Sequence, residues 1–153
     1  MGINNNFRDL VDTFFKQITE LGSLAITVVI IILTYFFDKR LSLRLFLGIA
    51  SVTIISIIVK SLFFHNRPKK QKIKTLIDRI DASSFPSVHS ARITIMIYLM
   101  IRYFSNIILQ IFLMLIGLLV IYSRIYLKKH YFRDIIAGTL LGLIMSIIIQ
   151  FIV

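Results

Sequence analysis

Residues 106–153, NIILQIFLMLIGLLVIYSRIYLKKHYFRDIIAGTLLGLIMSIIIQFIV, contain two long apolar runs separated by a short basic loop. The runs cover residues 106–126 and 132–153, and each has about the 20 apolar residues that a helix needs to cross a bilayer core of about 30 Å. Two such helices joined by a short loop run out and back across the membrane. The loop and the residues beside it are therefore predicted to lie at one membrane face.

Three further apolar runs precede these two, at residues 21–37, 43–64 and 87–104. Of the 153 residues, 58% are hydrophobic, and the mean hydropathy is +0.88. A soluble domain averages about 45–50% apolar residues, so this composition argues against one. The predicted fold class is all-α: an integral membrane bundle of five transmembrane helices, in a single domain covering residues 1–153. The chain has no cysteine, which excludes disulfides and thiolate metal sites.

Two segments outside the apolar runs have patterns of their own. Residues 1–20 repeat apolar side chains at three- and four-residue spacing with charged residues between them, which predicts an amphipathic helix lying in the membrane interface. Residues 65–85 are polar and basic, and they are predicted to form a loop with a short helix over the site described below. The lysines between Lys69 and Lys74 are interpreted equally well as a solvated loop or as a contact for anionic headgroups.

Basic residues outnumber acidic ones, with 18 Lys and Arg against 7 Asp and Glu, for a net charge of +11. Such a charge can indicate nucleic acid binding. Here, however, the cations lie between long apolar runs and do not form a stripe on a polar protein. The expected partners are therefore the bilayer and an anionic lipid or phosphate, with no nucleic acid and no obligatory protein partner.

Three segments beside the apolar runs carry most of the reactive side chains. They are Lys60, six residues and Arg67-Pro68; then Pro86-Ser87-Val88-His89; then Ser123-Arg124, five residues, His130, three residues and Asp134. Each alone has an ordinary structural interpretation: cations anchoring helix ends, a serine capping a helix, or a histidine and a carboxylate on one helix face. In an out-and-back topology, however, all three segments come to the same membrane face.

That combination favours a site for a phosphate group. Phosphoryl transfer without a metal requires fixed positive charge around the phosphate oxygens, an oriented nucleophile and a proton donor for the leaving oxygen. The guanidinium groups of Arg67 and Arg124 suit two-point contact with phosphate, and Lys60 adds a compact charge. Arg92, one turn after His89, is predicted either to line this pocket or to bind substrate.

In this order and on alternating helix ends, the three motifs resemble those of the type 2 phosphatidic acid phosphatase superfamily. The resemblance implies that His130 attacks phosphorus to form a phosphohistidine, that Asp134 orients its ring and that His89 protonates the leaving oxygen. It implies phosphate contacts from the other motif residues, namely Lys60, Arg67, Ser87, Val88, Ser123 and Arg124. It also implies that the reaction uses no metal and no other cofactor.

The chain departs from the family pattern at Val88, where the family usually has glycine. The family directs the backbone amide of this residue at phosphate, and valine keeps that amide. A β-branched residue, however, avoids the positive φ that glycine tolerates. Membrane members also commonly have six spans, so the N-terminal amphipathic helix is expected to take the place of the first.

The function predicted from these features is hydrolysis of the terminal phosphate of a membrane lipid. Compatible substrates are undecaprenyl diphosphate, phosphatidylglycerophosphate, phosphatidic acid and the 1-phosphate of lipid A. Two alternatives stay open: phosphoryl transfer to another hydroxyl group, and a non-catalytic protein that binds anionic lipids.

Membrane orientation is predicted differently by the resemblance and by the charges. Bacterial relatives work at the outer face of the cytoplasmic membrane, and we expect the same location here. The cations on the face opposite the motifs are Lys39, Arg40, Arg44 and Arg102. They are fewer than those on the motif face, and the positive-inside rule would place the richer face in the cytoplasm.

Overall fold

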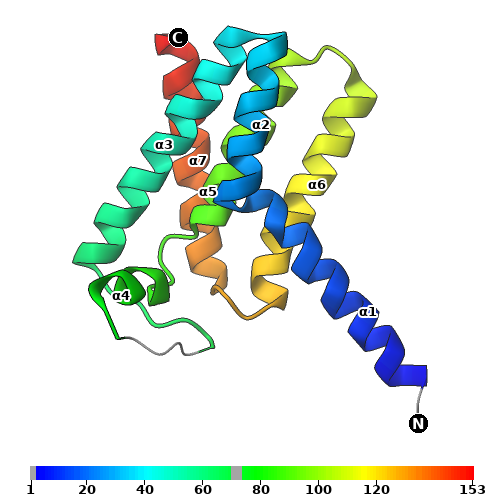
Figure 1. Ribbon diagram of the computed structural model, residues 1–153, viewed down its shortest axis with the longest axis vertical. Coiled ribbons are helices and arrows are strands. Elements are labelled where there is room, and N and C mark those ends of the chain that lie inside the picture. Colours follow the sequence, from blue (N-terminus) through cyan, green and yellow to red (C-terminus); the bar gives the residue numbers. More distant parts are fainter. Residues whose placement is uncertain (1–2, 70–73) are drawn as a thin grey trace.

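The computed structural model describes residues 3–69 and 74–153, and this part of the chain is helical without strands (Figure 1). The helices are α1 (Ile3–Ile18), a short 3-10 helix η1 (Thr19–Gly22), α2 (Leu24–Phe37), α3 (Lys39–Leu62), α4 (Leu76–Ala82), α5 (Val88–Tyr103), α6 (Ile107–Tyr126) and α7 (Phe132–Ile152). The predicted all-α membrane bundle is confirmed. Lys70 and Lys72, from the predicted loop cluster, lie outside the described residues.

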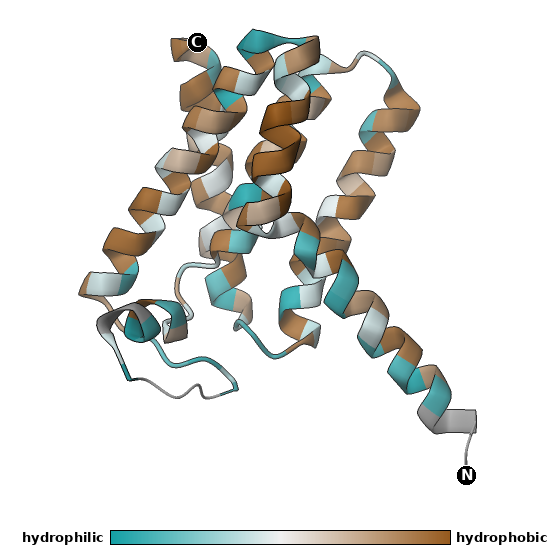
Figure 2. Ribbon diagram, in the orientation of Figure 1, coloured by the Kyte–Doolittle hydropathy of each residue, from teal (hydrophilic) through white to brown (hydrophobic). Residues whose placement is uncertain are grey.

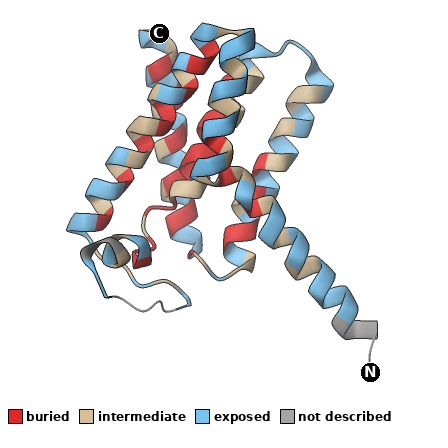
Figure 3. Cartoon of the chain, in the orientation of Figure 1, coloured by how far each residue is buried: buried red, intermediate tan, exposed pale blue. Residues whose placement is uncertain are grey.

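Helix α5 lies at the centre of the bundle and packs against α3, α6 and α7 (Figure 1). Buried residues gather along α5 and on the helices packed against it (Figure 3). The end of α3, the start of α5, the end of α6 and the start of α7 meet at one end of the bundle, with α4 beside them (Figure 1). This meeting point brings the three sequence motifs to one membrane face.

Hydrophobic residues predominate along the long helices (Figure 2), and many of the large ones are exposed on the outside of the bundle. On four different helices, Leu33, Ile54, Leu118 and Ile144 are each more than half exposed. A soluble protein does not expose so wide an apolar surface, whereas lipid chains cover one without penalty.

Not all of the five predicted spans have the length of a membrane helix. Among the described helices, α3, α6 and α7 are each long and apolar enough to cross a membrane, and the pair Asn6–Gly22 with Leu24–Phe37, bent by 52°, adds a fourth if it crosses as one. With 16 residues, α5 extends only about 24 Å at about 1.5 Å per residue. The count of five spans stays a prediction.

The apolar run 21–37 is corrected by the structure, because it is not one continuous helix. Gly22 ends η1, and Ser23 is extended, with φ −72° and ψ 158°. The Ser23 hydroxyl accepts the Ile26 N–H at 3.3 Å, which caps the start of α2. α2 therefore has 14 residues and extends only about 21 Å.

Side-chain caps also set the starts of two other helices. The Asp38 carboxylate accepts the Leu41 N–H at 2.8 Å, so α3 begins four residues before the predicted run at 43. The Asn106 side chain accepts two N–H groups at the start of α6. Free N–H groups at a helix start need acceptors, and Asp and Asn supply them where the apolar pattern alone does not mark the boundary.

α1 is the amphipathic helix that residues 1–20 predict, and it leads away from the bundle (Figure 1). Its apolar residues Phe7 and Leu10 are 68% and 69% exposed. Its C-terminal half docks on α6, where the Phe15 ring stacks on Tyr126 with centroids 4.3 Å apart. The exposed apolar side chains suit a helix in the membrane interface, which stays a prediction.

Glycines allow α7 to lie directly against α5. A Cβ added at Gly138 would lie 2.3 Å from the Ser87 carbonyl oxygen, and one at Gly142 would lie 2.6 Å from that of Ala91. Real side chains do not tolerate such distances to backbone atoms. The two glycines thus hold the start of α7 beside the start of α5, in agreement with the small-residue packing of membrane helices.

We expect Gly138→Ala to destabilise the protein by about 1–3 kcal/mol, because the added methyl group forces α7 away from Ser87. Thermal unfolding in detergent, followed by circular dichroism, measures this. Leu140→Ala is the matched control, since Leu140 is 53% exposed on the same helix. A Gly138→Ala protein as stable as the wild type would show that the α5–α7 contact is not tight.

Candidate active site

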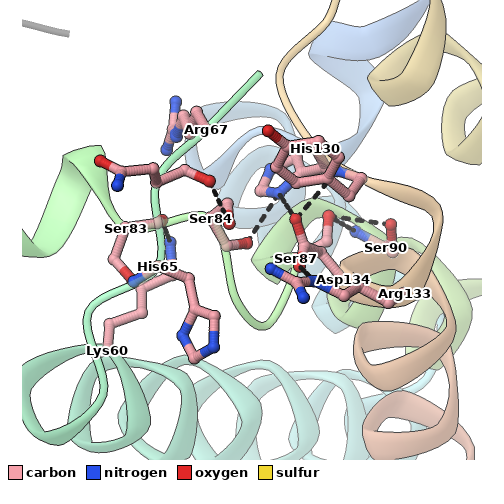
Figure 4. A network of polar contacts seen from close by, with 12 residues as sticks. Lys60, His65, Arg67, Ser83, Ser84, Ser87, Ser90, His130, Arg133 and Asp134 are labelled. Atoms are coloured by element: carbon pink, nitrogen blue, oxygen red, sulfur yellow. Dashed lines mark hydrogen bonds and ion pairs between the residues drawn. The ribbon is translucent and has the colours of Figure 1, made fainter. Parts of the chain in front are cut away.

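His130 lies in the loop between α6 and α7, and it is only 3% exposed. Its Nδ1 atom lies 2.8 Å from the carbonyl oxygen of Ser84 (Figure 4). A carbonyl oxygen can only accept a hydrogen bond, so Nδ1 carries the proton. In the neutral ring, Nε2 is then left with its lone pair, as a nucleophile requires.

The contacts of Asp134 differ from those expected of a residue that orients the His130 ring, the role that the resemblance implies. Its Oδ2 atom accepts the Tyr131 N–H at 2.9 Å and lies 3.9 Å from Nδ1 of His130, which is longer than a hydrogen bond. The Asp134 backbone oxygen accepts the Ser87 N–H at 3.0 Å. Asp134 thus caps α7 and ties the third motif to the second, while the Ser84 carbonyl holds the histidine ring.

Ser83 and Ser84 are site residues that the sequence motifs do not include. Both are fully buried, and the Ser83 carbonyl accepts a hydrogen bond from Nζ of Lys60 at 2.9 Å. The Ser84 N–H donates to the His65 carbonyl at 2.9 Å, which fixes the path of the chain (Figure 4). The pair of serines just before Pro86 could have pointed to this segment as part of the site. Their contribution comes from backbone carbonyl groups, however, and a sequence does not show which carbonyl groups contact a side chain.

Cations of the three motifs line one cavity of about 250 Å³ together with both motif histidines. The cavity contains Lys60, Arg67, Val88, His89, Arg92, Arg124 and His130. The sequence left open whether Arg92 lines the pocket or binds substrate, and the structure places it as a fourth cation lining this cavity. Ser87, Ser123 and Asp134 are buried and are not among the lining residues.

Neutral oxygen atoms hold these cations in place. Nζ of Lys60 donates to a carbonyl, Nη2 of Arg67 donates to the Asp81 carbonyl, and Nη1 of Arg124 donates to the Thr19 hydroxyl at 2.8 Å. In the described part of the chain, no carboxylate lies within 4.0 Å of these three cationic groups. The buried Nε atoms of Arg67 and Arg124 have no hydrogen-bond partner. Donors and charge are therefore left for an anion.

Ser87 and Val88 form the start of α5. The Ser87 hydroxyl accepts the Ser90 hydroxyl at 2.9 Å and caps the helix, as the structural interpretation of this motif predicts. Val88 begins the helix without a positive φ, since Lys128, at 53°, is the one non-glycine residue with positive φ in residues 3–69 and 74–153. Valine in place of glycine thus causes no backbone strain at this position.

A wider cavity of about 570 Å³ shares Arg67, His89 and Arg124 with the first. Its other lining residues come mainly from α1, η1 and the loops, and include Lys16, Thr19, Glu20, Lys69 and Lys129. η1 packs closely on His89, because a Cβ at Gly22 would lie 3.3 Å from that ring. The N-terminal segment, which no motif covers, is therefore one wall of the site.

The electrostatic environment of His130 favours its neutral form. Burial, followed by the positive charges of Arg124, Arg67 and Lys60, lowers the pKa of His130 to about 2. Burial also lowers the pKa of Arg67, with the Asp81 carboxylate acting in the opposite direction. His65 is not among the residues that line either cavity; its ring lies 5.5 Å from that of Phe85.

The described residues include no group of three or more His, Asp or Glu side chains placed to bind a metal ion. The charged and titratable side chains that do converge are four cations, two histidines and one carboxylate, Asp81, at one end of a membrane bundle. This is the arrangement of a membrane protein that handles a phosphate group.

The chain belongs to the PAP2 superfamily, whose family model matches residues 41–152. The crystal structure of LpxE from Aquifex aeolicus is similar, with a TM-score of 0.78 and 28% identity over 92% of this chain and 86% of that one. A transmembrane PAP2-type phosphatidylglycerolphosphate phosphatase from Bacillus subtilis has a TM-score of 0.75 and 21% identity over 94% and 76% of the two chains, which supports the fold. None of the curated proteins matches the sequence. The family and the similarity to LpxE support a membrane lipid phosphatase.

We expect His130 to stay neutral, with its proton on Nδ1, from about pH 8 to about pH 5. Burial and the nearby cations disfavour the imidazolium form, so protonation requires a pH far below the ordinary pKa of 6.5. ¹⁵N NMR of histidine-labelled protein measures this, with His130→Gln to assign the signal. A His130 signal that titrates near pH 6.5 would contradict the assigned environment.

Proposed function

We propose that the protein is a metal-independent lipid phosphatase that removes a terminal phosphate through a phosphohistidine on Nε2 of His130. The observation that carries this proposal is the hydrogen bond from Nδ1 of His130 to the Ser84 carbonyl, beside a cavity whose cations have no carboxylate oxygen within 4.0 Å in the described residues. This hydrogen bond leaves the lone pair of Nε2 free to act as a nucleophile, next to a cavity whose positive charge attracts phosphate.

In the first step, Nε2 of His130 bonds to phosphorus and the bond from phosphorus to the lipid oxygen breaks. His89, which lines the same cavity, supplies the proton that the leaving oxygen takes up. Lys60, Arg67 and Arg124 stabilise the negative charge on the phosphate oxygens during transfer.

In the second step, the oxygen of a water molecule bonds to phosphorus and the bond from phosphorus to Nε2 of His130 breaks. The water gives a proton to His89, and inorganic phosphate leaves. The wider cavity supports this hydrolysis, because its charged lining of Lys16, Glu20, Lys69 and Lys129 favours water beside His89. The same opening favours hydrolysis over transfer to a second lipid.

Replacing either His130 or His89 with alanine is expected to lower phosphate release from a lipid phosphate by at least about 1,000-fold, since nucleophile and acid act as a unit. The assay is run with purified protein in EDTA, with circular dichroism to show that the variants fold. His65→Ala is the matched control, because this histidine does not line either cavity. Full turnover by folded His130→Ala protein, or loss of wild-type turnover in EDTA, would overturn the mechanism.

Among the candidate lipid substrates, the position of Arg92 favours one with two linked phosphates. Its side chain is 8% exposed in α5, and Nε donates to the Thr53 hydroxyl at 3.2 Å with no carboxylate partner. A buried cation inside a membrane helix is costly and indicates a functional role. Arg92 lies one turn deeper into the bundle than His89, toward the bilayer that holds the lipid chain, and we propose that it contacts the inner phosphate of an isoprenoid diphosphate.

We expect Arg92→Gln to lower kcat/KM for an isoprenoid diphosphate about tenfold more than for phosphatidic acid, because it removes a charge-assisted hydrogen bond to the leaving group. Phosphate release from both lipids in mixed micelles measures the ratio. Arg79→Gln, on the exposed surface of α4, is the control. An equal loss with both substrates would instead assign Arg92 to the shared terminal phosphate.

We also propose that the protein lies in the bacterial cytoplasmic membrane with the catalytic cavity facing outward. The similarity to bacterial membrane members of the family supports this location. Because the chain has no cysteine, Lys128→Cys and Ser105→Cys report on the two faces with a membrane-impermeant thiol reagent. Labelling is expected at position 128 in intact cells. Labelling at position 105 alone would show that the protein has the opposite orientation.

A further inference from the structure

A second basic cavity, of about 180 Å³, lies at the end of the bundle away from the catalytic residues. Its lining comes from the start of α3 and the last turns of α5 and α7, which meet at the top of the bundle in Figure 1. Three arginines converge on it: Arg40, Arg44 and Arg102. The cavity exceeds the volume of a single water molecule, which occupies about 30 Å³ in the liquid.

The positive charge of this cavity is largely unbalanced. Asp38 is the one carboxylate that lines it, and Oδ1 of that carboxylate accepts the N–H of Leu41 as the cap of α3. In the described residues, none of the three arginines has a carboxylate oxygen within 4.0 Å. Three cations and one carboxylate leave a net charge of +2 around the cavity.

Arg44 also has an unsatisfied donor in this cavity. Its Nε atom is buried and has no hydrogen-bond partner. A buried N–H without an acceptor costs free energy, so its presence points to an acceptor bound there. Tyr103 and Gln150 line the same cavity and can donate further hydrogen bonds.

The surroundings place this cavity at the level of lipid headgroups. Next to it along the chain, Phe37 and Phe151 are 84% and 87% exposed, so large apolar side chains border the arginines. Aromatic residues and arginines at the ends of apolar helices mark the membrane interface. A phosphate in this position can be held by guanidinium groups while its lipid chains lie against the exposed aromatic rings.

We propose that this cavity binds the phosphate of an anionic phospholipid in the leaflet opposite the catalytic cavity. The bound phosphate accepts hydrogen bonds from Arg44 and Arg102 and offsets part of the net charge. A zwitterionic lipid binds less well, because its ammonium group brings positive charge back to the arginines. The site is independent of the phosphatase reaction and is not consumed by it, since the ligand is a phosphodiester.

Lys39 offers a matched control for charge alone. It is exposed on the same membrane face, next to Arg40 in sequence, and it is not among the residues that line the cavity. Its Nζ atom lies 5.7 Å from the centre of the Tyr35 ring. Lys39→Gln removes the same charge as Arg44→Gln but leaves the cavity intact.

The test is native mass spectrometry of the purified protein titrated with phosphatidylglycerol or phosphatidylcholine. The wild type is expected to bind phosphatidylglycerol more tightly. Arg44→Gln and Arg102→Gln are each expected to weaken that binding about tenfold, and Lys39→Gln less than twofold. Arg44→Lys keeps the charge but loses Nε, and an intermediate loss is expected from it if Arg44→Gln does not fold.

Three results would overturn the proposal. Equal losses in Lys39→Gln and Arg44→Gln would show diffuse attraction to the membrane surface. Equal binding of the two lipids would show that the arginines do not select an anion. Displacement of phosphatidylglycerol by millimolar inorganic phosphate would assign the cavity to free phosphate and not to a lipid headgroup.

Discussion

The contact between the start of α5 and the start of α7 is the interaction on which the site depends. The Ser87 N–H donates to the Asp134 carbonyl at 3.0 Å, and Gly138 leaves room for the Ser87 carbonyl. In a bilayer, apolar burial does not drive helices together, so close packing and hydrogen bonds must do so. Because His89 belongs to α5 and His130 lies two residues before α7, this one contact brings both histidines to the same cavity.

A second constraint is the way in which the protein keeps buried cations together. Lys60, Arg67 and Arg124 repel one another, and carboxylates would neutralise the charge that phosphate needs. Carbonyl and hydroxyl oxygens satisfy some of their donors without cancelling that charge. In the proposed function, a phosphate supplies the missing negative charge. Bringing these cations together without a counter-charge costs free energy, and the same electrostatics makes the cavity selective for an anion.

Much of the fold and of the site could be predicted from the sequence. The apolar runs 106–126 and 132–153 agree with α6 and α7 to within a residue, because length and apolarity limit a membrane helix strongly. The prediction of a single helix over residues 21–37 was wrong, since Ser23 caps a new helix there and the apolar pattern does not reveal this cap. Arg67, His89, Arg124 and His130 do meet in one cavity, whereas Ser87 and Asp134 mainly hold helix starts in place.

By itself, the sequence determined the class of protein and indicated that the three motifs lie at one end of the bundle, because both depend on apolar length and on order along the chain. Which atoms touch was decided only by the tertiary structure. Nδ1 of His130 donates a hydrogen bond to the carbonyl of Ser84, a residue 46 positions away. The N-terminal segment forms one wall of the site. Every residue has a carbonyl, so only the path of the folded backbone selects the one that orients the histidine.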